Sequence, residues 1–211
     1  MKDKEEAENT PDRSSRSVAS NGTVTSIFRQ SWELILREIR DVLSAVDVDQ
    51  AEAFVTALLS AEKAFFVGVG RVGLALQTVV KRLNHLGLQA WYVGDLAEPA
   101  ITERDLLVVA SASGESVVPR AVAEVAKRFG AKIAHIGSNP SSSLRSLTDI
   151  FVRIPANTRL ARDGEIESRQ IMTSLFEQAL LVFGDAVALA VVTRRAITDL
   201  GQLWTRHANL E

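Results

Sequence analysis

The chain has 211 residues, of which 46% are hydrophobic and 24% charged, and its formal net charge is -2. This length is sufficient for one sizeable globular domain plus some extra helix or tail. The small net charge argues against a nucleic-acid binder, and we expect neither nucleic acid nor a membrane as a partner. The chain contains no cysteine, which excludes disulfides, thiolate chemistry and cysteine-based metal sites.

The first segment, residues 1–22, is polar, charged and rich in serine, so we expect a disordered tail there. It has no apolar core and cannot serve as a secretory signal, which makes a cytoplasmic location the expectation. Between residues 24 and 60, apolar residues recur at helical spacing. We therefore expect residues 23–211 to form a single domain that begins with an extension of two helices.

Five short apolar runs follow, rich in β-branched and aromatic residues. These runs are residues 64–69, 90–93, 106–110, 133–136 and 150–154. Helical patterns separate most of them, as in successive βαβ units. The sequence thus predicts an α/β fold with a doubly wound, five-stranded parallel sheet flanked by helices. Residues 174–197 predict a long apolar helix, and Glu177 and Asp185 inside it favour a buried helix over a membrane span.

A loop rich in serine follows the third apolar run and contains Ser111, Ser113, Gly114 and Ser116. Glycine permits tight backbone geometry, the hydroxyls can donate hydrogen bonds, and the next helix presents free amides. These features together predict a phosphate site, although a serine-capped helix start has the same composition. Such sheets bind ligands beyond the carboxyl ends of their strands, so we expect loops 68–73, 111–116 and 137–143 to gather there.

A second glycine pattern, GVGRVG, follows the first apolar run, and Asp95 closes the next run. This spacing matches a dinucleotide fingerprint, so a dehydrogenase is an alternative. Arg71 lies between the glycines and suits a sugar or phosphate oxygen, and Gly70 beside it is a candidate binding residue. The serine loop would also be redundant if a pyrophosphate occupied GVGRVG.

Several motifs together resemble one family. GVGRVG, RLNHLG (residues 82–87), YVGD (92–95), SASGES (111–116), SLFEQALL (174–181) and the terminal RHANLE (206–211) are similar to those of the 6-phospho-3-hexuloisomerases. These are members of the sugar isomerase (SIS) domain family. The resemblance implies a flavodoxin-like sheet and a homotetramer with sites shared between subunits. It also implies interconversion of D-arabino-3-hexulose 6-phosphate and fructose 6-phosphate, in the ribulose monophosphate route of formaldehyde fixation.

The resemblance also assigns roles to single residues. Isomerisation through an enediol needs one base, and Glu177 near the start of its helix is the candidate. Without the resemblance, a first-turn glutamate that complements the helix dipole would be the better interpretation. His207 in RHANLE is the second catalytic candidate, and His85 in RLNHLG can reach a partner's pocket, whereas His135 is interpreted as structural. We expect no metal and no cofactor, since no histidine and carboxylate have metal-ligand spacing.

Five residues depart from the pattern of the family. Val72, Ala112, Ser116, Ile171 and Thr173 stand where the family usually has serine, glycine, threonine, proline and glycine. They leave open an isomerase of another phosphosugar, such as an arabinose 5-phosphate or a heptose phosphate. A non-catalytic, phosphosugar-binding SIS module is the remaining alternative.

Overall fold

The computed structural model describes residues 23–210, so the predicted tail, residues 1–22, lies outside the described residues. Two helices precede the sheet, α1 (Val24–Ser44) and α2 (Val48–Ser60), as predicted. The chain divides into two compact units within α1, and everything below concerns the second unit, residues 35–210.

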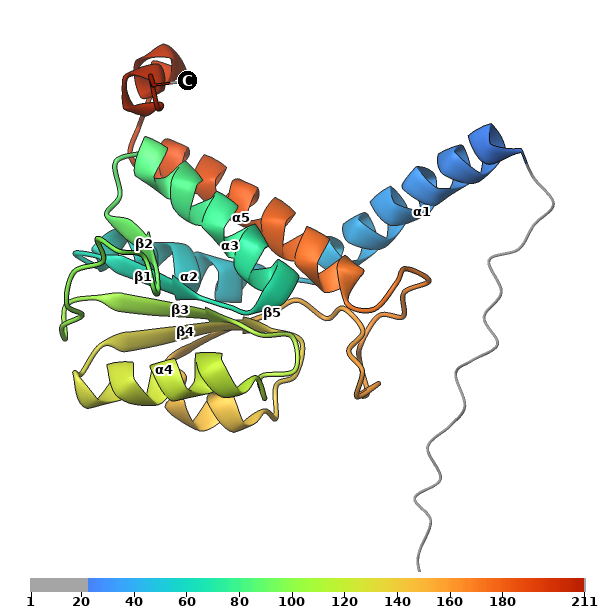
Figure 1. The fold of residues 1–211 in the computed structure, drawn as a ribbon, viewed down its shortest axis with the longest axis horizontal. Helices are drawn as coiled ribbons and strands as arrows, with labels where there is room; N and C mark the ends of the chain where they lie inside the picture. The colour runs from blue at the N-terminus through green and yellow to red at the C-terminus, as the bar shows by residue number, and fades with distance from the viewer. Residues whose placement is uncertain (1–22, 211) are drawn as a thin grey trace, which may run out of the picture. The chain divides into compact units, whose positions relative to one another are not determined.

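Five parallel strands form one sheet in the order β2-β1-β3-β4-β5 (Figure 1). Their bounds are β1 (Ala64–Val67), β2 (Ala90–Tyr92), β3 (Leu106–Ala110), β4 (Lys132–Gly137) and β5 (Ile150–Arg153). This is the flavodoxin-like strand order, in which the direction of winding reverses between β1 and β3. The predicted α/β class and the five-stranded parallel sheet are confirmed.

Helices cover both faces of the sheet. One face packs against α2, α3 (Gly70–His85) and α5 (Ser174–Arg194), and the other against α4 (Val117–Arg128) and the short helix η1 (Ser143–Leu147) (Figure 1). Successive strand residues alternate between these two cores, with Phe66 in the first and Phe65 in the second. Burial on both faces explains why the strands are continuous apolar runs.

The long helices α3 and α5 lie side by side and start at the same end of the fold (Figure 1). A Cβ added at Gly184 would lie 2.3 Å from a methyl of Val79, so glycine permits this close packing. By length and apolar composition α5 is the one described helix that could cross a membrane. Its Leu175, Phe176 and Leu180 are buried in the protein core, which fits the predicted buried helix.

Candidate functional site

A cavity of about 620 Å³ lies beyond the carboxyl ends of β1 and β3, where the winding of the sheet reverses. Four segments line it: the start of α3, the serine loop (residues 111–116), residues 158–160, and the turn that leads into α5. Gly70, Arg71, Ser111, Ser113, Ser116 and Glu177 are the predicted site residues among its lining. The structure therefore brings the two predicted loops and the predicted base to one hollow.

The serine loop is closed by its own hydrogen bonds. The hydroxyls of Ser111 and Ser116 lie 3.1 Å apart, and the amide of Gly114 donates to the Ser111 hydroxyl at 3.1 Å. Gly114 has a φ of +68°, and a Cβ there would lie 2.3 Å from Ser142. Gly114 thus shapes the loop, while the three serines line the cavity. Ser116 caps α4 without a side-chain hydrogen bond, which leaves the first amides of α4 for an anion.

Two side chains support the serine loop from the side of β4. His135 Nε2 donates to the Ser111 carbonyl at 3.0 Å, and Asn139 Nδ2 donates to the Ser113 carbonyl at 3.0 Å. Burial lowers the pKa of His135 below its ordinary value, although its hydrogen bond to Ser111 acts in the opposite direction. Loop 137–143 therefore gathers against the serine loop, as expected, and braces it, although none of its residues lines the cavity.

The carboxylate of Glu177 has two partners inside the cavity. Arg71 Nε forms an ion pair with Glu177 Oε2, and the Thr173 hydroxyl donates to Oε1 at 2.9 Å. The Glu177 side chain is 11% exposed, whereas that of Arg71 is 66% exposed. The first turn of α5 thus fixes the carboxylate at the cavity wall, and the guanidinium covers it from the side of α3.

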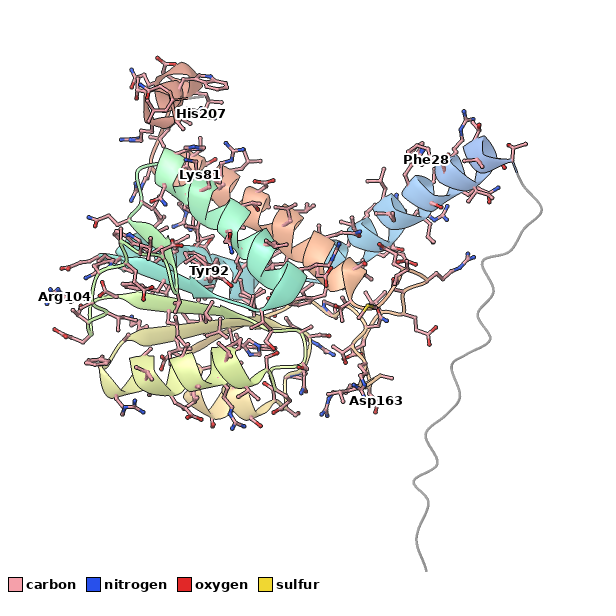
Figure 2. The ribbon with its side chains drawn as sticks, viewed as in Figure 1. Phe28, Lys81, Tyr92, Arg104, Asp163 and His207 are labelled. Atoms are coloured by element: carbon pink, nitrogen blue, oxygen red, sulfur yellow. The ribbon has the colours of Figure 1, made fainter. Side chains whose placement is uncertain are left out.

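The two candidate histidines lie together, away from this cavity. His85 and His207 stack with ring centroids 5.4 Å apart, and Trp204 packs against His207 at 5.3 Å. His85 ends α3, fourteen residues after Arg71, which corresponds to about 21 Å along a helix. Figure 2 shows His207 beyond the end of α3 that carries Lys81. In one chain, neither imidazole lines the cavity that holds Glu177.

Comparisons with known proteins fit this arrangement. The SIS domain model matches residues 57–182. The chain belongs to the SIS domain family. It is 40% identical to the 3-hexulose-6-phosphate isomerase of Mycobacterium gastri, over 84% of this chain and 88% of that protein. It is 34% identical to the protein of that name from Bacillus subtilis, over 84% of this chain and 95% of the relative. These relatives confirm the resemblance stated from the motifs.

A solved structure supports the fold as well. The chain superposes with a TM-score of 0.74 on a protein from Methanococcus jannaschii, over 86% of this chain and 99% of that one. The two are 24% identical, so this likeness concerns the SIS fold alone.

The glycine pattern GVGRVG has a structural explanation in this SIS domain. The Tyr92 hydroxyl donates to the Gly68 carbonyl at 2.5 Å, and a Cβ at Gly73 would lie 2.5 Å from that hydroxyl. Tyr92 lies beneath α3 (Figure 2). Asp95 accepts a hydrogen bond from the Tyr92 amide at 3.1 Å and so closes a local turn. The glycines of GVGRVG therefore allow the close contact between β2 and the start of α3. The spacing between GVGRVG and Asp95 alone gives no support for a dinucleotide site.

Sequence reasoning missed the part of the cavity contributed by the β5–α5 segment (residues 154–173). The sequence of this segment predicts only a polar loop. Five of its residues nevertheless line the cavity: Thr158, Arg159, Leu160, Ile171 and Met172. Its position before the helix of the predicted base was the available signal. Parallel strands end at one edge of a sheet, so the chain after β5 must cross near this cavity.

The five departures from the family pattern all lie at the site of this SIS domain. Val72, Ala112, Ser116, Ile171 and Thr173 line the cavity, and Thr173 also contacts the Glu177 carboxylate. The chain therefore differs from the usual pattern at several of the residues that line the cavity.

Proposed function

We propose that this SIS-domain protein is a phosphosugar isomerase that interconverts D-arabino-3-hexulose 6-phosphate and fructose 6-phosphate. One observation carries the proposal: the carboxylate of Glu177 lines the same cavity as the serine loop. Two relatives at 34% and 40% identity bear the name of this isomerase, which supports the choice of substrate.

The serine loop is suited to the phosphate group of the sugar. The serine hydroxyls that do not donate within the loop and the free amides at the start of α4 provide hydrogen-bond donors, and the helix dipole favours an anion at this end. With the phosphate held there, the carbon chain of the sugar extends through the cavity toward Glu177. Binding at a remote group fixes the reacting carbons against the base.

The isomerisation moves a carbonyl from carbon 3 to carbon 2. Glu177 takes the proton from carbon 2, the bonding electrons form a double bond between carbons 2 and 3, and oxygen 3 is protonated. The enediol then loses the proton on oxygen 2, carbon 2 becomes the carbonyl, and Glu177 returns its proton to carbon 3. One carboxylate is sufficient for both carbon steps because they occur on adjacent atoms.

Arg71 supports this chemistry in two ways. Its Nε holds Glu177 Oε2, which orients the carboxylate, and the rest of its guanidinium has donors for a sugar oxygen. An arginine beside the enediol stabilises the negative charge that develops on the oxygens.

The proton transfers between the sugar oxygens are assigned to His207 or His85 of a second subunit. His85 follows Arg71 by about 21 Å along α3 of the same chain, and His207 stacks on His85, which argues for action across an interface. Burial lowers the pKa of His85, and the positive charges of Lys81, Arg82 and His207 lower it further. A homotetramer with shared sites stays a prediction from the resemblance, and a cytoplasmic location stays a prediction from the composition of residues 1–22.

The test is turnover by the purified protein. Hexulose 6-phosphate is generated in situ from formaldehyde and ribulose 5-phosphate by a synthase, and fructose 6-phosphate is measured. We expect fructose 6-phosphate to form only when the protein is present. If arabinose 5-phosphate or a heptose phosphate is isomerised instead, the substrate assignment is wrong and the altered residues Val72 and Thr173 account for it.

A further inference from the structure

Three ionisable side chains line the cavity: Arg71, Arg159 and Glu177. Arg71 and Glu177 form an ion pair and so neutralise each other. The Arg159 side chain is exposed and makes no hydrogen bond or ion pair with any residue that the structure describes. At a pH where the carboxylate is ionised, the lining therefore carries one excess positive charge, and it belongs to Arg159.

The backbone on both sides of Arg159 is fixed. Thr158 is 4% exposed, and its amide and hydroxyl both donate to the Glu165 carboxylate at 2.7 Å. The amide of Leu160 donates back to the Thr158 hydroxyl at 3.2 Å. Arg159 thus lies in a closed turn, and the Glu165 carboxylate of that turn already accepts both hydrogen bonds from Thr158.

The turn that carries Arg159 lies close to the serine loop. The pKa of Glu115, which follows Gly114 in that loop, is lowered mainly by hydrogen bonds from Ser143, and also by the positive charges of Arg120 and Arg162. Glu115 accepts from the Ser143 amide at 2.8 Å and from its hydroxyl at 2.5 Å. The acidic residue of the serine loop is therefore also occupied, and Arg159 has no competing carboxylate in the cavity lining besides Glu177.

We propose that Arg159 binds the phosphate group of the substrate together with the serine loop. The inference rests on the proposed function in one respect, that the substrate carries a phosphate. A guanidinium forms charge-assisted, bidentate hydrogen bonds to phosphate, which neutral hydroxyls cannot provide. The Nε of Arg71 is already held by Glu177 Oε2, so Arg71 offers a phosphate fewer donors than Arg159 does. Arg159 thus allows Arg71 to stay with the base.

The test measures binding with inorganic phosphate and with fructose 6-phosphate as probes. Arg159→Gln is compared with Arg162→Gln, which removes the same charge from the same segment but does not line the cavity. Calorimetry at one ionic strength gives Kd for both probes. For Arg159→Gln we expect Kd to rise roughly 10- to 100-fold for both, because a charge-assisted contact is lost. Arg159→Lys restores part of the affinity, and Arg162→Gln changes Kd less than about twofold.

Steady-state kinetics gives a second measurement. Arg159→Gln raises KM for the hexulose phosphate by a factor similar to the rise in Kd, whereas kcat changes less, since the contact is made equally before and during proton transfer. Wild-type affinity in Arg159→Gln, or an equal loss in the two glutamine variants, overturns the inference. Phosphate binding that depends on Arg159 without any turnover of the wild-type protein supports the inference and contradicts the proposed function. No binding of either probe to the wild-type protein contradicts both.

Discussion

At their N-terminal ends, α3 and α5 bring Arg71 and Glu177 into one ion pair at the wall of a cavity, whereas at the C-terminal end of α3 His85 stacks on His207. The cavity end is built from four segments and held by many hydrogen bonds. The histidine end is held by ring contacts and by a 3.4 Å hydrogen bond from Arg206 to the His85 carbonyl. Two parallel helices of this length separate the predicted base from the predicted proton shuttle.

This separation has a consequence for the assembly. Two packed helices cannot bring their opposite ends together, so the cavity of one chain holds the predicted base and the predicted phosphate site but neither His85 nor His207. If both ends act in one reaction, they must come from different copies of the chain. In a symmetric oligomer, each subunit then contributes a histidine to the cavity of its partner, and the partner contributes one to its own cavity in return.

The largest expected effect is at the cavity end. Glu177→Gln removes the base but keeps a side chain of the same size, and we expect kcat to fall about 10²- to 10⁴-fold. Fructose 6-phosphate should still bind, which calorimetry measures. Asp185→Asn is the matched control, since Asp185 is on the same helix but exposed. Normal turnover by Glu177→Gln removes the residue from the mechanism.

At the histidine end, His207→Ala is expected to lower kcat about 10²-fold if the ring transfers protons. Mixing the unfolded His207→Ala and Glu177→Gln chains and refolding them together tests sharing directly. Roughly a quarter of the sites then regain both residues, because each site draws one from each of two subunits. Absence of any regained activity, with mixed oligomers present, shows that the two residues do not meet across an interface.

A smaller effect on the rate is expected from substitution of Thr173, whose hydroxyl donates to Glu177 Oε1. Thr173→Val keeps the shape but removes this donor to a charged acceptor, so we expect kcat to fall roughly tenfold with little change in KM. Thr173→Ser keeps the hydroxyl and should restore most of the rate. A normal rate in Thr173→Val, with a loss in Thr173→Ser, would mean that the methyl group, and not the hydroxyl, matters.

The smallest effect is a pH dependence of stability. Burial lowers the pKa of His135 below 6.5 in the folded protein, so the unfolded chain binds a proton first as the pH falls. The stabilisation is complete above the ordinary pKa of histidine and is lost progressively below it. Urea unfolding at about pH 7.5 and pH 5.5 should show a smaller decrease for His135→Gln than for the wild-type protein. Equal decreases would assign the pH dependence to other groups.

Much of this fold could be predicted because strands buried on both faces are continuous apolar runs, as Leu106–Ala110 shows. The serine loop could be proposed because it follows a buried strand, whereas Glu177 was proposed from the resemblance of SLFEQALL to the family motif; the structure places both at one cavity. Arg159 was not found, because its role depends on Thr158, Glu165 and a turn without any periodic pattern. The stacking of His85 on His207 was also hidden, since it joins residues from opposite halves of the chain through tertiary packing.

Hydrogen exchange at carbon 3 of fructose 6-phosphate tests the central claim most directly, since the reverse reaction begins with removal of that proton. The substrate is incubated in heavy water with wild-type protein or with Glu177→Gln, and deuterium at each carbon is followed by nuclear magnetic resonance. Deuterium should enter at carbon 3 with the wild-type protein and not with Glu177→Gln, although both bind the sugar. Exchange at carbon 3 that persists in Glu177→Gln would contradict the account.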